Sequence, residues 1–278
     1  IRDGFLSRSL VFDDYEIFVA LDESKSKLIG VIALGVVHCC VDGVKIQAGH
    51  GYDLKVDPDF RRKGIARKMS DFIIEEFRSK KSITNIFITM KSDNIGMNKM
   101  STYLDRHGVY DFTYLTIPTY KRIKIENSIG NTEKQLLQIT IFDSNSNEPY
   151  VMRTSNGLGI WKSYLTYQLK IVDMPTLFNW ASKAANWFRP ADKKLPTIGD
   201  TLKFATLFDF NQKNIAGVNE ALQILQEKHV DYLNVCCIKG DFVYRNLRKS
   251  AINELAYCMQ NSFDVNNGQR LVLEARYL

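Results

Sequence analysis

The chain has 278 residues, of which 45% are hydrophobic and 24% are charged, and its net charge is +6. This length can bury a sizeable core in one or two domains, and the composition is that of an ordinary globular protein. No basic tract is dense enough, or sufficiently interleaved with aromatic residues, to indicate nucleic-acid binding. No window holds the roughly 20 apolar residues that span a bilayer. We therefore expect neither nucleic acid nor a membrane as a partner.

The five cysteines include two adjacent pairs, Cys39–Cys40 and Cys236–Cys237, and both pairs lie in apolar runs typical of strands. Neighbours in a strand point to opposite faces, so adjacent cysteines make poor disulfide partners. No spacing of Cys and His matches a zinc site. We expect buried free thiols, no metal, and a reducing compartment such as the cytoplasm. No signal-peptide pattern opens the sequence, which begins with Ile1 rather than methionine.

The first half, residues 1–125, predicts a meander of strands followed by alternating helices and strands. Asp42-Gly43 is a strong hairpin signal inside the meander. Gly108 is expected to act as the C-cap of the second helix. The expected elements are strands at 16–20, 28–40, 44–56, 85–90 and 110–117, and helices at 64–80 and 98–106.

A polar segment at 126–133 separates this half from a second one, residues 134–278, with a similar order of elements. Together they predict an α/β fold, of the α+β mixed-sheet kind, in two lobes. The helix at 176–188 carries aromatic residues that suit either a membrane surface or the packing of one lobe on the other, and we expect the packing. The elements expected here are strands at 138–142, 150–153, 161–171, 202–210, 232–238 and 271–277, and helices at 176–188, 215–227 and 246–260.

The most informative segment is residues 52–68, where a strand ending at Val56 leads through a basic loop into a helix. The free N–H groups at a helix N-terminus and the helix dipole form an anion site. Gly64 permits close approach of a phosphate, Ala66 leaves the first turn uncrowded, and the basic side chains add positive charge. On composition alone, a solvated basic turn before an ordinary helix is an equal alternative.

The pattern Val-x-Pro-x-x-Arg-Arg-x-Gly-Ile-Ala, which begins at Val56, resembles the pyrophosphate loop of the GNAT N-acetyltransferases. The family signature is Arg/Gln-x-x-Gly-x-Gly/Ala, and the preceding hairpin and following helix and strand fit as well. The resemblance covers residues of about 16–117. It implies a GNAT lobe that binds acetyl-CoA as co-substrate, with the pantetheine arm along one strand and the diphosphate in the loop. The cofactor-binding residues it implies are Leu54, Lys55, Val56, Arg61, Arg62, Lys63, Gly64, Ile65 and Ala66.

A second family landmark, Asn-x-x-Ala-x-x-Leu-Tyr-x-Lys/Arg-x-Gly-Phe, is matched imperfectly by Met97–Val109. Met97 stands where the family has asparagine, and Asn94 close by is expected to contact the cofactor. Leu104 stands where the family has the tyrosine that often protonates the CoA thiolate. Tyr103 is one residue away and is the candidate general acid, although a role in the helix core is the alternative.

The general base is expected on the strand before the loop, where His50, Tyr52 and Asp53 are candidates. His50 occupies the position of a catalytic glutamate in some family members, and an imidazole titrates in the useful range. Strand alternation places His50, Tyr52 and Leu54 on one face, with Asp53 on the other unless a bulge intervenes.

The second half lacks the loop signature and has Asn211–Asn214 between the corresponding strand and helix. A GNAT lobe, a Trp-containing strand (Gly157–Trp161) and a degenerate second lobe resemble the plant hookless-type acetyltransferases and the animal histidine N-acetyltransferase group. We expect an N-acetyltransferase, monomeric or homodimeric, whose acceptor is a primary amine. A small metabolite or amino acid is expected rather than a polyamine, because no acidic channel or peptide-binding repeat stands out. A protein lysine or N-terminal acetyltransferase, and a non-catalytic CoA-binding regulator, are the alternatives.

Overall fold

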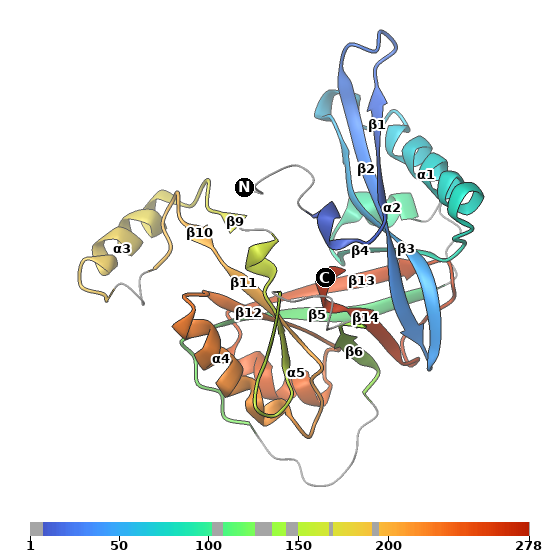
Figure 1. Ribbon diagram of the computed structural model, residues 1–278. Helices are drawn as coiled ribbons and strands as arrows, with labels where there is room; N and C mark the ends of the chain where they lie inside the picture. The colour runs from blue at the N-terminus through green and yellow to red at the C-terminus, as the bar shows by residue number, and fades with distance from the viewer. Residues whose placement is uncertain are drawn as a thin grey trace.

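A computed structural model describes residues 8–101, 108–125, 135–142, 150–166, 169–190 and 195–277. Within these residues a twelve-stranded mixed sheet runs through both halves of the chain, with helices packed on its faces (Figure 1). The α/β class with a mixed sheet is confirmed. The strand order is β6-β14-β2-β3-β4-β13-β5-β12-β11-β8-β7, and β1 pairs with the outer edge of β2.

The first half follows the predicted meander closely. Asp42 (φ 47°) and Gly43 (φ 92°) form the hairpin turn between β2 and β3, in the left-handed conformations that such a turn requires. Helix α1 buries Met69, Ile73 and Phe77 against the sheet, as its 3–4 residue spacing predicts. The elements are β1 (Tyr15–Leu21), β2 (Leu28–Val41), β3 (Val44–Val56), α1 (Ile65–Lys81), β4 (Ile86–Lys91), α2 (Ile95–Ser101) and β5 (Gly108–Pro118).

The second half contains a β11–α4–β12 unit in which the two strands are parallel, as β3 and β4 are around α1. The same local arrangement therefore occurs once in each half. Helix α4 packs its apolar face onto β12 (Figure 1). The elements are β6 (Leu137–Thr140), β7 (Val151–Arg153), β8 (Gly159–Trp161), β9 (Leu169–Lys170), α3 (Thr176–Asn186), β10 (Thr201–Leu202), β11 (Phe204–Phe208), α4 (Val218–Glu227), β12 (Tyr232–Cys237), α5 (Phe242–Leu247), β13 (Asn253–Asn261) and β14 (Leu271–Glu274).

The helix expected at 246–260 is wrong, because Asn253–Asn261 form strand β13. This strand lies between β4 and β5, antiparallel to both, and so belongs to the centre of the first half's sheet. Leu, Ala, Met and Gln favour helix locally, but pairing on both sides overrides that preference. A short helix, α5, precedes the strand instead.

Two further expectations are corrected. Gly108 begins β5 rather than capping a helix, and a Cβ there would lie 2.2 Å from the carbonyl oxygen of Val265. Its lack of a side chain is needed for that close approach. The long strand expected at 161–171 is interrupted after Trp161 by a 3₁₀ turn, Ser163–Leu165, and only Leu169–Lys170 is extended again.

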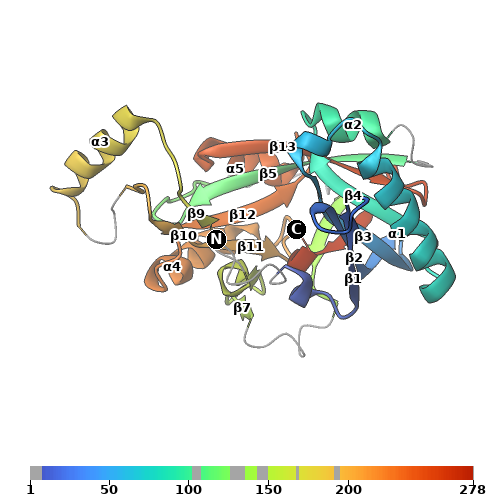
Figure 2. The same ribbon diagram turned by 90° about the horizontal axis from the view of Figure 1, so that it is seen from above.

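Helix α3 does not pack one lobe on the other. It stands away from the body of the molecule on a stem made of β9 and β10 (Figures 1 and 2). Its aromatic residues are exposed to solvent, as Trp180 (70%) and Phe178 (67%) illustrate. The expectation of a lobe-packing helix is therefore wrong for the described residues.

The two halves share their hydrogen bonds as well as their sheet. Asn261, at the end of β13, donates to the carbonyl oxygens of Gly108 and Val265 and accepts from the N–H of Val265. The expected boundary at 126–133 falls outside the described residues, so the division into two domains remains a prediction. The five cysteines are free thiols, and burial raises the pKa of Cys39 to about 12.

Candidate active site

A β-bulge in β3 determines the shape of the site. Val31 pairs with Lys55 and Ala33 pairs with Tyr52, so Asp53 and Leu54 together lie opposite a single residue of β2. Asp53 takes a left-handed conformation (φ 52°), which an aspartate tolerates better than most residues. Beyond this extra residue, each side chain of β3 points to the face opposite the one that simple alternation predicts. Leu54 therefore packs on the α1 side, and the expectation that it shares a face with Tyr52 is wrong.

Strands β3 and β4 separate just before this bulge. Their parallel pairing consists of three positions and ends where Gly51 meets Ile88. The rest of β3, to Val56, and of β4, to Lys91, diverge and leave an opening in the sheet. The edge of β3 that faces this opening is not paired with β4, so its backbone groups are available to an extended ligand.

The loop from Asp57 to Gly64 leads from β3 into α1. The carboxylate of Asp57 accepts the N–H of Asp59 (2.9 Å), and Arg61 Nε donates to the carbonyl of Val56 (3.0 Å). Gly64 caps α1 in a left-handed conformation (φ 78°), and no atom lies within 4 Å of where its Cβ would be. The first-turn N–H groups of α1 lack acceptors within the helix, as at any helix N-terminus. Open space, free donors and basic side chains together fit a diphosphate.

A cavity of about 810 Å³ passes through the opening between β3 and β4. On the α1 side it is lined by aliphatic residues of the first half, and α1 itself contributes Ser70, Ile73 and Ile74. On the other side it is lined mainly by strands of the second half, and by β5. Such a volume is within the range of pockets that bind small organic ligands.

The strand register explains why the second half lines that far side. Tyr257 lies opposite Lys91, and Asn253 lies opposite Thr116, which in turn lies opposite Asn234. Directly opposed residues share a face of the sheet, so these side chains line one continuous surface away from α1. Its further members are Tyr114, Leu255, Tyr232, Phe204 and Thr206.

This surface is aromatic and mostly uncharged. Phe204 stacks on Tyr232 with ring centroids 5.3 Å apart, and Tyr114 meets Tyr257 edge to face at 4.9 Å. The hydroxyl of Thr116 donates to Oδ1 of Asn234 (3.0 Å), which leaves the amide N–H groups of Asn234 as donors. Sequence reasoning did not find these residues, because they come from four strands distant in the chain.

The candidate catalytic residues of the sequence separate in space. Tyr52 lines the cavity and donates to Ser9 Oγ (2.8 Å), and burial raises its pKa. His50 lies behind the cavity wall, stacked on Phe87 at 4.7 Å, with Nε2 3.3 Å from the hydroxyl of Thr89. Thr89 itself lines the cavity.

Asp53 is the only carboxylate among the described residues that line the cavity. One of its oxygens is 3.5 Å from Arg8 and 4.0 Å from Lys55. The guanidinium of Arg8 also lies 5.2 Å from the ring centre of Tyr52. Asp53 thus lies at the bulge, between the α1 side of the cavity and its far side.

Other predicted site residues are placed as follows. Asn94 lines the cavity, and its side chain accepts the N–H of Met97 at the start of α2 (3.1 Å). Leu54 and Lys55 line the cavity, whereas Arg61 to Gly64 belong to the loop before α1, and Ile65 and Ala66 to its first turn. Tyr103 lies outside the described residues. Within the described chain no group of three or more His, Cys, Asp or Glu could hold a metal ion.

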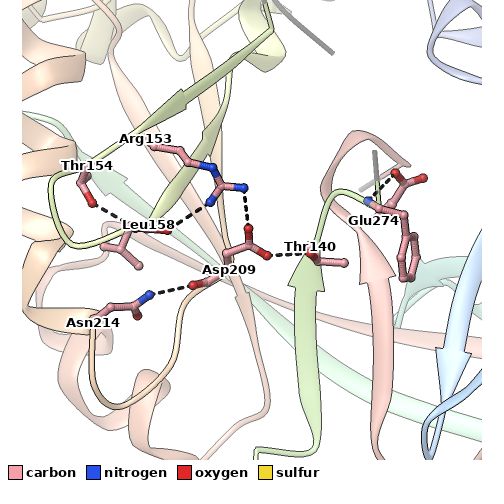
Figure 3. Close-up of polar contacts among 9 residues, drawn as sticks. Thr140, Arg153, Thr154, Leu158, Asp209, Asn214 and Glu274 are labelled. Carbon is pink, nitrogen blue, oxygen red and sulfur yellow. Dashed lines mark hydrogen bonds and ion pairs between the residues drawn. The ribbon is translucent and has the colours of Figure 1, made fainter. Parts of the chain in front are cut away.

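In the corresponding loop of the second half, side chains bind the loop's own backbone groups; the side-chain amide of Asn214 donates to the carbonyl of Asp209 (2.8 Å; Figure 3). Oδ1 of Asn211 accepts the N–H of Lys213, and Oδ1 of Asn214 accepts the N–H of Asn211, both at 2.8 Å. The carboxylate of Asp209 at the end of β11 binds Thr140 (2.6 Å) and Arg153 (2.9 Å). These amides are occupied and a negative charge stands beside them, so this loop does not offer a second phosphate site.

Residues 13–103 match the family model described as acetyltransferase (GNAT) domain. This first part of the chain is therefore similar to GNAT acetyltransferase domains. The match covers β1 to α2 and therefore includes the bulge, the opening and the basic loop. It supports an acyltransferase enzyme, as the sequence predicts.

Solved structures resemble the chain well beyond this segment. N-myristoyltransferase of Saccharomyces cerevisiae, solved with bound myristoyl-CoA, is 11% identical with a TM-score of 0.50, over 92% of this chain and 72% of that one. A glucosamine N-acetyltransferase region of a fungal multi-domain β-N-acetylglucosaminidase is 15% identical with a TM-score of 0.52, over 92% of this chain and 34% of that one. At these identities the likeness shows the fold alone. The search of curated proteins found no match.

Burial lowers the pKa of His50, in the matched segment, to about 3, and the positive charge of Arg8 adds to the effect. The folded protein keeps this imidazole neutral, whereas the unfolded chain takes up a proton near pH 6.5. As pH falls from 6.5 towards 3, His50 therefore lowers the free energy of unfolding, by up to about 1.4 kcal/mol per pH unit.

We expect His50→Phe to flatten the pH dependence of stability below pH 6.5, because the unfolded chain then loses that proton site. Urea unfolding of wild type and variant between pH 7.5 and about 5 measures the effect. His38→Gln, at an exposed position of β2, is the control and should keep the wild-type slope. Equal slopes for wild type and His50→Phe would contradict the assignment.

Proposed function

We propose that the protein is an acetyl-CoA-dependent N-acetyltransferase whose acceptor is a small primary amine. The main support is the cavity that passes through the opening between β3 and β4, because it joins the cofactor side of the sheet to the surface made by the second half. The amine and the thioester can meet there from opposite sides of one sheet. Holding both reactants in one place supplies much of the rate of such a transfer.

Acetyl-CoA is expected to lie along β3 and α1. The unpaired edge of Leu54–Val56 would hydrogen-bond the pantetheine arm, and the loop around Gly64 would hold the diphosphate. A backbone N–H of that edge would stabilise the oxyanion of the thioester carbonyl. Transfer forms a bond from the amine nitrogen to the carbonyl carbon and breaks the bond from that carbon to sulfur.

We assign to Asp53 the role of accepting the proton of the acceptor ammonium. A carboxylate at the bulge can hold the ammonium at the opening and then accept its proton. His50 is a weaker candidate, since it does not line the cavity, whereas Asp53 does. Protonation of the CoA thiolate by Tyr103 remains a proposal from the sequence.

The acceptor is expected to be small and not polycationic. The far side of the cavity offers tyrosine rings, Asn234 and two threonine hydroxyls. Among the described residues that line the cavity, Asp53 is the only acidic one. Polyamines and lysine-rich peptides carry several positive charges that such a surface does not neutralise. An amino acid or another polar amine fits better, with aromatic faces for packing and Asn234 for hydrogen bonding.

The class of acceptor is tested by thiol release from acetyl-CoA with amino acids, amino sugars, polyamines and lysine-containing peptides. We expect release with a small polar amine and little with polyamines or peptides. Turnover of peptides alone would replace the small-amine proposal by a protein acetyltransferase. Tight CoA binding without release by any amine would favour the non-catalytic alternative.

Gly64→Glu is expected to abolish acetyl-CoA binding, because the new carboxylate enters the phosphate site and a non-glycine residue is strained at this φ. We expect the dissociation constant to rise at least about 100-fold, as judged by titration calorimetry. Gly268→Glu is the matched control, since Gly268 also has a positive φ (99°) and open space but lies in a loop before β14. Unchanged binding by Gly64→Glu would mean that the loop does not hold the cofactor.

Asp53→Asn is expected to lower kcat by about 100-fold or more, because it removes the proton acceptor, while acetyl-CoA still binds. Asp71→Asn, on the exposed side of α1, is the control and should retain activity. His50→Gln serves as the comparison within the site. If kcat fell about 100-fold in His50→Gln and stayed near the wild-type value in Asp53→Asn, the general base would be His50 instead.

A further inference from the structure

The segment from β9 to β10, described over residues 169–190 and 195–202, forms an arm that projects from the molecule (Figures 1 and 2). The arm carries helix α3 on a two-stranded stem, Leu169–Lys170 paired with Thr201–Leu202. Several large apolar side chains of the arm are largely exposed to solvent. They include Val172 (75%), Leu177 (80%), Phe178 (67%), Trp180 (70%), Trp187 (88%) and Phe188 (90%).

The helix is attached to its own arm through its polar face. The side chain of Asn186 donates to the carbonyl of Leu195 (2.7 Å) and accepts its N–H (2.6 Å). Asn179 accepts the N–H of Ile198 (3.4 Å), and Ser182 is buried. Successive helical residues are 100° apart, so these three lie on one side of the helix, and Leu177 and Trp180 lie on the other.

This arrangement is the reverse of an ordinary surface helix, which buries its apolar face and exposes its polar one. The hydrogen bonds of Asn186 and Asn179 hold the polar face inward and so keep the apolar face outward. A contiguous exposed apolar surface of this kind marks a site of interaction.

The charges around this face favour a lipid surface over a second copy of the chain. Lys183, on the polar half of the helix, and Arg189, just beyond its end, are both exposed. The described residues of the arm contain three Lys and Arg against two Asp. Two such arms facing each other would bring like charges together, whereas anionic headgroups would neutralise them.

Tryptophan and phenylalanine on one face, with basic residues on the other, are typical of helices that lie in a membrane interface. We infer that the arm docks on an anionic membrane, with Trp180, Trp187 and Phe188 inserted among the headgroups. The basic side chains reach the phosphates while their stems cover apolar surface. This reverses the expectation from sequence that the protein has no membrane partner.

The contact is peripheral. In the described part of the chain no helix is long and apolar enough to cross a bilayer, and α3 itself has eleven residues. The stem residues Leu169 and Leu202 also line the cavity, on the side assigned to the acceptor. A docked arm therefore holds that side of the cavity near the membrane.

Flotation of the 278-residue chain with lipid vesicles tests the inference. Vesicles of phosphatidylcholine alone are compared with vesicles that also contain phosphatidylserine. We expect binding to the anionic vesicles to exceed binding to the neutral ones by on the order of tenfold, and to weaken as salt is added.

The double variant Trp187→Ser with Phe188→Ser should lose at least about tenfold of this binding, because it removes two side chains that would insert. Both are almost fully exposed, so the fold should be unaffected, and retained acetyl-CoA binding verifies this. The control is Val44→Ser with Tyr120→Ser, which removes two exposed apolar side chains outside the arm (65% and 58% exposed) and should bind like wild type.

Tryptophan fluorescence gives a second measurement. Trp161 is buried (3% exposed), so a blue shift on addition of vesicles reports Trp180 and Trp187. Absence of binding to both kinds of vesicle would overturn the inference, as would binding that survives the double substitution. A dimer that sediments without lipid and dissociates in the double variant would also overturn it, in favour of a second copy.

Discussion

The β-bulge at Asp53 is the feature on which the site depends. One extra residue in β3 changes which side chains face α1, and the pairing of β3 with β4 ends two residues before it, at Gly51. The bulge and the opening in the sheet therefore lie side by side. The local strain of a non-glycine residue at positive φ costs on the order of 1 kcal/mol, and the long β2–β3 pairing offsets it. Strain of this kind is common where a strand is shaped for function.

The two halves contribute different chemistry to the same opening. The first half provides free backbone donors at the start of α1 and an unpaired strand edge, which suit an anionic, extended ligand. The second half has the same strand–helix–strand unit, but Asn211 and Asn214 occupy its loop amides and Asp209 places a negative charge beside them. It therefore contributes side chains instead, through β13, β12 and β11, to the far side of the cavity.

The basic loop, the hairpin and α1 could be predicted from sequence because local rules specify them: Asp-Gly for the turn, a 3–4 residue apolar spacing for α1, and glycine at its N-terminus. The bulge at Asp53 could be raised only as a possibility, since it follows from the register with β2. Strand β13 was mistaken for a helix, because its residues favour helix locally and its pairing partners lie about 140 to 170 residues away.

The far side of the cavity was missed for the same reason. Asn234, Thr116 and Tyr257 carry no motif, and only the sheet register brings them together. Helix α3 was misjudged because an apolar face predicts burial, and the sequence does not show that Asn179 and Asn186 turn the polar face inward. The aromatic side chains of this segment could be identified from sequence, but the expected packing of one lobe on the other was wrong.

The most direct test of the central claim is a crystal structure of the protein with CoA bound. The account predicts the diphosphate at the loop of Gly64, the pantetheine arm along Leu54–Val56, and the sulfur at the opening between β3 and β4, beside Asp53. CoA bound elsewhere, or a β3–β4 pair closed beyond Gly51 with the sulfur on the surface, would contradict it. In that case the two sides of the cavity would not be the two halves of one active site.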